Sequence, residues 1–256
     1  MDESLKSDDV WPAIRLPLEL SPDLVHVIRV RLDLPFIAAA DMNAILSDDE
    51  RQRAVRFRFD EPRQRFATCR TTLRKLLGSC CGILPNAVPL RYGDHGKPEL
   101  SFTELEPHLP RIEFSVSHSG DLGLIAITKE SAVGIDIEEC NPAVKTLRLA
   151  QRFFAPPEAA ELSQLPPEKQ LAGFYRGWTC KEAYIKATGL GMSLSLSSFC
   201  VTIDPDQPAS LHHVVNQPTE PQRWTIQSGD VAPNYAAAVM VAHPHCRIAC
   251  WNWPSG

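Results

Sequence analysis

The sequence predicts an α+β protein built from two similar α/β half-domains, and an internal similarity is the main reason. Residues 65–78 (RFATCRTTLRKLLG) align without a gap to residues 176–189 (RGWTCKEAYIKATG), with the same residue at five of the fourteen positions. Ser119-Gly120-Asp121 reappears as Ser228-Gly229-Asp230 at nearly the same spacing. Strand-like and helix-like segments follow in the same order around both repeats, so we expect a fused duplication with pseudo-two-fold symmetry.

Local patterns define the elements of the first half. Its first 22 residues are polar and rich in proline, and we expect them to form a surface arm. Ser47 and Glu50 have the spacing of a capping box, which places a helix start directly after Ser47. The helical pattern that follows is interrupted near Pro62 and ends at Gly78. The elements expected in residues 1–129 are a strand at 25–32, these helices, and strands at 90–92, 113–116 and 122–127.

The second half repeats this order of elements. Its expected elements, in residues 130–256, are a strand at 132–138, helices at 143–154 and 171–188, and strands at 199–203, 223–227 and 236–242. We expect the loop at 189–192 to close the second of these helices, because it begins with glycine.

The composition excludes several classes of protein. Hydrophobic residues make up 44% of the chain, which is enough for a core and excludes wholesale disorder. The formal net charge of −5 argues against a nucleic-acid partner held by a general basic surface. No apolar run approaches the ~18–20 residues that span a bilayer, so no membrane partner is expected. Eight cysteines without a CxxC pair favour a reducing, cytoplasmic location.

Two carboxylates lie two residues apart in the sequence VGIDIE, at Asp136 and Glu138. Side chains alternate along a strand, so both point to the same face. A pair of carboxylates suits Mg²⁺, which prefers oxygen ligands. The same pattern is typical of an acidic, solvent-exposed strand end, and the motif alone favours that interpretation.

A helical motif, WTCKEAYIK at 178–186, supplies a third carboxylate, Glu182, and two lysines, Lys181 and Lys186. Glu182 and Lys186 are four residues apart and therefore share one side of a helix. Taken alone, the motif is an amphipathic helix with one surface ion pair. Together with the two strand carboxylates, it predicts a metal site bordered by lysines, as required for a pyrophosphate or nucleotide.

Two further segments could bind an anion. Gly96-Lys97-Pro98 predicts a turn that presents a lysine, and Ser117-His118 lie at the end of a predicted strand, where a hydroxyl and an imidazole are available. Neighbouring side chains on a strand point to opposite faces, and no G-x-S-x-G motif is present, so a Ser-His hydrolase is not favoured. The Walker A and G-x-G-x-x-G motifs are also absent.

Four segments follow one another along the chain: GKPEL, FSVSHSG, VGIDIE and WTCKEAYIKATGLGM. In this order they resemble the motif set of the 4′-phosphopantetheinyl transferases. The likeness covers about residues 45–245 and is to the monomeric, surfactin-type branch, whose members have two similar halves with the active site in the cleft between them. The family moves the phosphopantetheine arm of coenzyme A to a serine of an apo acyl or peptidyl carrier protein and releases adenosine 3′,5′-bisphosphate. The resemblance therefore implies a transferase that uses Mg²⁺, with Mn²⁺ as an alternative, in fatty-acid, polyketide or nonribosomal peptide biosynthesis.

The resemblance also implies roles for individual residues. Asp136, Glu138 and Glu182 would hold the metal ion with the coenzyme A pyrophosphate. Glu182, or a water that it orients, would accept the proton of the carrier serine, and Lys186 would assist the leaving oxygen. The remaining contacts with the coenzyme would come from Lys97, Ser117, His118 and Lys181.

The 3′-phosphate of the coenzyme is met in the family by basic residues of the helix after the first strand. Arg53 matches one such position, but Glu50 occupies the other, with Arg51 beside it. Arg65 and Arg70 are further candidates, although solvated arginines on an amphipathic helix explain them equally well.

The carrier-docking surface and the tail leave alternatives open. Phe153-Phe154 could dock the carrier, and a core aromatic pair is an equally good interpretation. His243-Pro244-His245-Cys246 and Cys250 fit no common zinc spacing, so no zinc site is expected. Two other functions remain as alternatives: a degenerate homologue that only binds coenzyme A or a carrier, and a metal-dependent phosphohydrolase.

Overall fold

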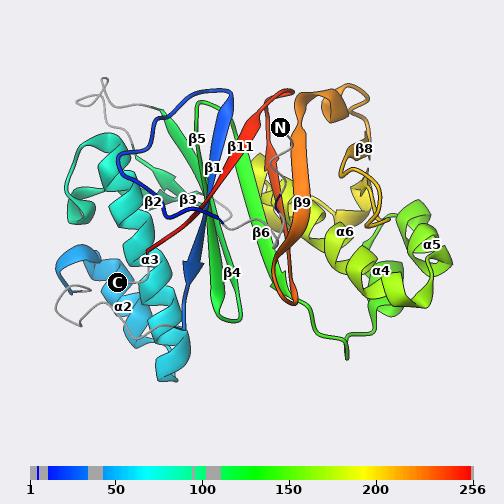
Figure 1. The fold of residues 1–256 in the computed structure, drawn as a ribbon, viewed down its shortest axis with the longest axis horizontal. Helices are drawn as coiled ribbons and strands as arrows, with labels where there is room; N and C mark the ends of the chain where they lie inside the picture. Colours follow the sequence, from blue (N-terminus) through cyan, green and yellow to red (C-terminus); the bar gives the residue numbers. More distant parts are fainter. Residues whose placement is uncertain (1–4, 6–10, 34–42, 94–95, 102–110, 255–256) are drawn as a thin grey trace.

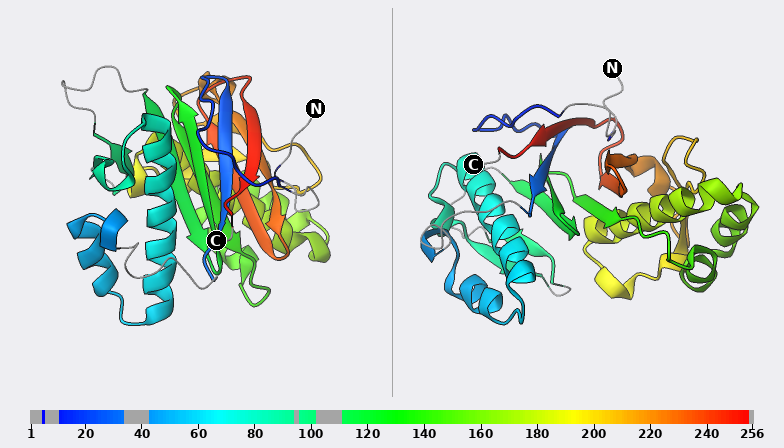
Figure 2. Two further views of the ribbon diagram at one scale, coloured as in Figure 1. Left: turned by 60° about the vertical axis from the view of Figure 1, so that its left-hand side comes forward. Right: turned by 60° about the horizontal axis from the view of Figure 1, so that its bottom comes forward.

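The computed structural model describes residues 5, 11–33, 43–93, 96–101 and 111–254, and it has four layers (Figure 1). Two β-sheets lie against each other in the middle, and the long helices α3 (Asp60–Cys81) and α6 (Pro167–Thr188) cover their outer sides (Figures 1 and 2). Three clusters of buried apolar side chains fill the spaces between these layers. The mixed α/β architecture predicted from the sequence is therefore confirmed.

The first unit combines strand β1, two helices and the β4-β5 hairpin with a small additional strand pair. Its elements are β1 (Leu24–Arg31), α2 (Asp48–Val55), α3, β4 (Ile112–Ser119) and β5 (Leu122–Lys129). The short strands β2 (Leu90–Tyr92) and β3 (Pro98–Leu100) form a separate antiparallel pair. Strand β1 pairs antiparallel with β5, which pairs antiparallel with β4.

The second unit has the same connectivity. Its elements are β6 (Val133–Glu139), α4 (Thr146–Phe153), α5 (Pro156–Gln164), α6, β9 (Thr225–Ala232) and β10 (Tyr235–Val241), with a small pair of strands, β7 (Phe199–Val201) and β8 (Leu211–Val214). Strand β6 pairs antiparallel with β10, which pairs antiparallel with β9. The order β6-β10-β9 thus repeats the order β1-β5-β4.

The last strand, β11 (Arg247–Asn252), leaves the second unit and pairs in parallel with β1 at the edge of the first sheet. The N-terminal segment lies next to it, since Ile14 N–H donates to the carbonyl of Asn252 at 2.9 Å. The described part of this segment lies mostly at the surface, as expected, but Leu5, Trp11 and Ile14 are buried and anchor it. Leu5 and Trp11 belong to the apolar cluster between the two sheets, and Ile14 belongs to the cluster between α3 and the first sheet.

Other predicted boundaries need correction. Pro62 lies in the first turn of α3, where its missing N–H costs no hydrogen bond, and the interruption falls at residues 56–59. The helix continues past Gly78 to Cys81 and ends at Gly82, which has a left-handed φ of 69°. The predicted match of Ser228-Gly229-Asp230 is also wrong, since these residues lie inside β9, whereas Ser119 ends β4 and Gly120-Asp121 form the turn after it.

The sequence similarity between residues 65–78 and 176–189 falls on α3 and α6, the two helices that cover the sheets. Gly189 closes α6 with a left-handed φ of 70°, as expected. Within the described residues, no helix combines the length and apolarity needed to cross a membrane.

In the second unit, the backbones of β6 and α6 approach each other closely at Gly134. A Cβ atom on Gly134 would lie 1.9 Å from the carbonyl oxygen of Ala183 and 2.5 Å from the amide nitrogen of Ala187. Both atoms belong to the helix backbone, so they cannot move aside as a side chain can. Glycine at this position therefore lets the strand that carries Asp136 lie directly against the helix that carries Glu182.

We expect Gly134→Ala to lower the free energy of unfolding by about 3 kcal/mol or more, because the added methyl overlaps the helix backbone. The control is Gly123→Ala, also in a buried strand, where the nearest atom is Leu32 Cδ1 at 3.5 Å. That change should stay within about 1 kcal/mol of wild type. Urea unfolding of both variants measures the difference, and equal stabilities would contradict the close packing.

Candidate active site

The candidate site lies where the edge strand of one sheet meets the edge strand of the other. Strand β4 ends the first sheet and β6 ends the second, and side chains of β4 bridge the two. Ile135 N–H donates to Ser115 Oγ at 3.1 Å, and Glu139 N–H donates to Ser119 Oγ at 3.0 Å. Alternate serines of β4 thus bind the main chain of β6, in place of a backbone ladder.

Asp136 is the most deeply buried of the predicted carboxylates, with 3% of its surface exposed. Its Oδ1 accepts hydrogen bonds from Ser117 Oγ at 2.8 Å and from Lys186 Nζ at 2.7 Å. Its Oδ2 is buried and has no hydrogen-bond partner among the described residues. A buried carboxylate oxygen without a partner is costly, so this atom is suited to bind a cation.

Glu138 and Glu182 are half-buried and lie in the same electrostatic environment as Asp136. Burial raises the pKa of Glu138, the charge of Asp136 raises it further, and the hydrogen bond from Ser119 opposes both effects. Burial likewise raises the pKa of Glu182, and Asp136 adds to this increase. Three carboxylates that repel one another at one place favour a shared cation.

These three side chains supply only oxygen atoms, which suits a hard ion such as Mg²⁺. Within the part of the chain that the structure describes, no three acidic, histidine or cysteine side chains are already gathered at metal-binding distances. The orphaned Oδ2 of Asp136 and the oxygen-only donor set nevertheless fit such an ion. All eight cysteines lie among the described residues, and none of them forms a disulfide.

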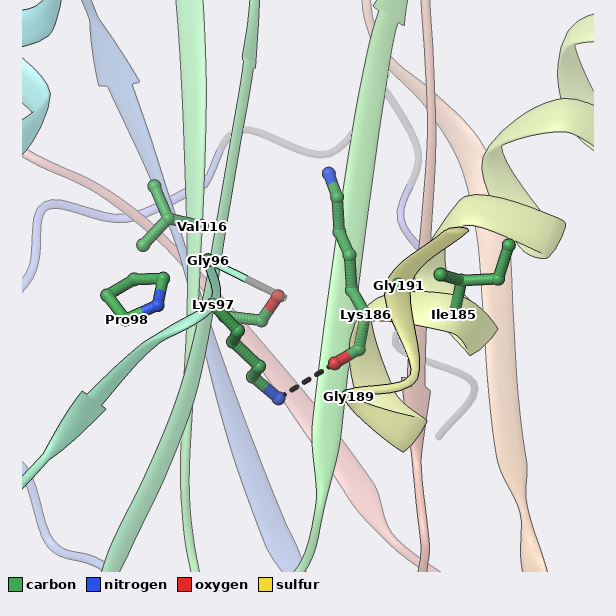
Figure 3. Close-up of a pocket in the computed structure, with 9 residues that line it drawn as sticks. Gly96, Lys97, Pro98, Val116, Ile185, Lys186, Gly189 and Gly191 are labelled. Carbon is green, nitrogen blue, oxygen red and sulfur yellow. Dashed lines mark hydrogen bonds between the residues drawn. The ribbon is translucent and has the colours of Figure 1, made fainter. Parts of the chain in front are cut away.

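Lys97 and Lys186 line a cavity of about 220 Å³ between the two units, and the side chain of Lys97 ends at the main chain of Lys186 (Figure 3). Lys186 pairs with Asp136 across the interface, rather than forming the surface ion pair that its helix spacing suggested. Lys97 Nζ donates to the carbonyl oxygens of Lys186 at 2.8 Å and Val133 at 3.0 Å. Burial lowers the pKa of Lys97.

A positive region adjoins the carboxylates on the exposed side of β4. Desolvation by neighbouring groups lowers the pKa of His118, and the charges of Lys186, Arg53 and Arg65 lower it further. Mutual repulsion of cations at one place favours an anionic ligand. Arg53 is exposed, whereas Arg65 already pairs with Glu61 and Asp121.

Lys181 lies elsewhere, and its predicted place beside the carboxylates is wrong. Its side chain has no exposed surface and pairs with Glu158 at 2.7 Å. It also donates to the carbonyl oxygens of Leu196 at 2.7 Å and Phe199 at 2.6 Å. These contacts use all three hydrogens of the ammonium group, so Lys181 stabilises the core of the second unit.

Other candidate residues belong to the core. Glu50 is buried and holds Arg74 at 2.6 Å, with Arg70 at 3.5 Å, so it joins α2 to α3. Phe154 is 3% exposed and stacks on Phe174, which supports the interpretation as a core aromatic residue.

Sequence reasoning missed the hydrogen bonds that join Ser115 and Ser119 to the main chain of β6. The signal was present, because serine occurs at every second position of FSVSHS and alternate residues of a strand share a face. What could not be foreseen was that this face meets the edge of a second sheet.

Comparisons with known proteins show which family this chain is similar to. A family profile described as the 4′-phosphopantetheinyl transferase superfamily matches residues 132–240, and one described as 4′-phosphopantetheinyl transferase, N-terminal, matches residues 38–130. The 4′-phosphopantetheinyl transferase HetI of Nostoc sp. is 40% identical over 92% of this chain and 95% of its own length. The 4′-phosphopantetheinyl transferase Sfp of Bacillus subtilis is 33% identical over 79% and 90%.

We expect Lys181→Met to lower the free energy of unfolding by about 3–5 kcal/mol, because it leaves the buried carboxylate of Glu158 without its partner. The double variant Lys181→Met/Glu158→Gln should lose less, since a neutral amide replaces the orphaned charge. Chemical denaturation of wild type and both variants measures the difference. A double variant less stable than Lys181→Met would contradict a buried ion pair.

Proposed function

Because the chain belongs to the 4′-phosphopantetheinyl transferase superfamily and is a 4′-phosphopantetheinyl transferase, we propose that it transfers the arm of coenzyme A to a serine hydroxyl of an apo carrier protein. The products are the holo carrier protein and adenosine 3′,5′-bisphosphate, and the reaction requires Mg²⁺ or Mn²⁺. The observation that carries this proposal is the unpartnered Oδ2 of Asp136, held in one electrostatic environment with Glu138, Glu182 and Lys186.

Asp136, Glu138 and Glu182 are the residues that would hold the metal ion. When bound, the ion would neutralise the negative charge that develops on the phosphoryl oxygens. Ser117 supports this arrangement from the other unit, because it donates to Asp136 at 2.8 Å and accepts from Lys186 at 2.8 Å.

Glu182 is the proposed general base, acting directly or through a water. The serine oxygen forms a bond to the phosphorus of the phosphopantetheine arm. The bond from that phosphorus to the bridging oxygen of the pyrophosphate breaks, and this oxygen leaves with adenosine 3′,5′-bisphosphate. The serine proton goes to Glu182, either directly or through that water. Lys186 would stabilise the leaving oxygen with its positive charge, or donate a proton to it.

The coenzyme phosphates would meet the basic region beside these carboxylates. His118 and Arg53 lie in that region, and Lys97 lines the cavity next to Lys186. Ser117 is placed to contact a phosphate only if it gives up one of its present hydrogen bonds. Of the sequence candidates for the 3′-phosphate, Arg53 is the best supported, because it is exposed while Arg65 and Arg70 are paired with acids.

We also propose that the two units arose by duplication and that the active site lies between them. The repeated strand order and the matching segments on α3 and α6 support the duplication. Residues 1–129 would supply the coenzyme phosphate contacts, and residues 130–256 the metal ligands, the base and the carrier-docking surface. A monomeric, cytoplasmic protein without a nucleic-acid or membrane partner stays a prediction.

The direct test is to incubate the protein with coenzyme A, Mg²⁺ and each of several apo carrier proteins, and to weigh the carriers by mass spectrometry. The expected result is a gain of one phosphopantetheine arm on at least one carrier. Coenzyme A binding without any mass gain would indicate a non-catalytic binder, and carrier-independent release of phosphate from simple esters would indicate a phosphohydrolase.

We expect Asp136→Ala and Glu182→Gln each to reduce the transfer rate by about 10²–10⁴-fold while the fold is retained, because each removes a proposed metal ligand and Glu182→Gln also removes the base. The control is Glu139→Gln, which neutralises an exposed carboxylate on the same strand and should leave transfer nearly unchanged. Transfer rates are measured with one carrier, and circular dichroism checks the fold. Near-normal turnover of either site variant would remove that residue from its role.

A further inference from the structure

Ser119 makes two hydrogen bonds that have no part in the proposed function described above. Its Oγ accepts the hydrogen bond from Glu139 N–H at 3.0 Å and donates to Glu138 Oε2 at 3.2 Å. It is the last residue of β4, so it belongs to the first unit, whereas both partners belong to β6 of the second. One hydroxyl therefore joins the main chain of the metal-binding strand to a carboxylate on the same strand.

The geometry of this hydroxyl restricts the position of the Glu138 carboxylate. A hydroxyl has one hydrogen to donate, and its direction is limited once a neighbouring N–H occupies one of its lone pairs. The N–H of Glu139 fixes Ser119 against the backbone, so the single hydrogen that remains points at Glu138. A glutamate side chain has three rotatable bonds, and a hydrogen bond to its carboxylate restricts that freedom before any ligand binds.

The neighbouring serines show that this contact is distinct from the rest of the interface. Ser115 binds only the main chain, through Ile135 N–H, and touches no carboxylate. Ser117 binds Asp136, which is held a second time by Lys186. Glu138 also accepts a hydrogen bond from the side chain of Trp178, in its own unit, so Ser119 is a donor that the first unit supplies to this carboxylate.

We propose that Ser119 is a positioning residue for the reaction, which orients Glu138 so that the metal ion is bound in the geometry that transfer requires. The inference rests on the proposed function, because it takes Glu138 as a metal ligand. Ser119 itself touches neither the ion nor the substrate. Partners of metal ligands of this kind change metal affinity or activity by about 10–100-fold when they are removed.

The test compares Ser119→Ala, Ser119→Thr and the matched control Ser115→Ala in the full-length protein. Mn²⁺ binding in the presence of coenzyme A is measured from the electron paramagnetic resonance signal of free Mn²⁺, and the Mg²⁺ concentration for half-maximal transfer is measured separately. Ser119→Ala should weaken Mn²⁺ binding and raise the Mg²⁺ requirement by about tenfold or more, with kcat at saturating Mg²⁺ within about threefold of wild type. Ser119→Thr keeps a hydroxyl and should restore both values.

Ser115→Ala should leave both metal measurements unchanged, although it removes a hydrogen bond across the same interface. Equal weakening by Ser115→Ala and Ser119→Ala would overturn the proposal, because the effect would then come from the interface as a whole. Normal Mn²⁺ binding by Ser119→Ala, or no Mn²⁺ binding by wild type, would also overturn it. Failure of the proposed function would give a different result. The wild-type protein would then modify no carrier protein, whatever Mn²⁺ affinity is measured for Ser119→Ala.

Discussion

The interaction on which the site depends is the side-chain bridge between β4 and β6, two edge strands from different sheets. An edge strand presents backbone groups that need partners, and a continuous ladder between these strands would merge the two sheets into one. Ser115 and Ser119 satisfy backbone N–H groups of β6 while keeping the sheets separate. Because the same face of β4 also reaches Asp136 and Glu138, the contacts that join the two units also orient the acidic residues.

Buried charge distinguishes the structural parts of the protein from the site. Glu158 with Lys181, and Glu50 with Arg74, are buried ion pairs whose main hydrogen-bonding groups have partners within the fold. Breaking such a pair is costly, and its charged groups are already paired with each other rather than available to a ligand. Asp136 differs, because one of its oxygens is paired and the other is buried without a partner. An incomplete environment of this kind around a charged group is typical of a functional site.

Local patterns were sufficient to predict most of the fold, and to place Asp136 and Glu138 on one strand and Glu182 and Lys186 on one helix, because alternation and helix spacing depend on neighbouring residues. The same spacing already separates Lys186 from Lys181: Lys186 lies four residues after Glu182 and shares its face, whereas Lys181 is adjacent to Glu182 and points about 100° away. Distant pairings could not be predicted. Strand β11 was missed because its partner β1 lies more than two hundred residues earlier in the chain, and its own segment alternates weakly. The burial of Trp11 depends on that same pairing.

The position of Lys186 shows how the first unit controls the proposed catalytic helix. Lys97 donates to the main-chain carbonyl of Lys186 in the last turn of α6, where helix carbonyls lack partners and a positive charge is favourable. Ser117 accepts a hydrogen bond from the ammonium group of the same residue. Both the backbone and the tip of Lys186 are thus held by residues of the first unit, although Lys186 belongs to the second. A movement between the units would therefore break these contacts, so the position of the Lys186 ammonium group depends on the fit between the two units.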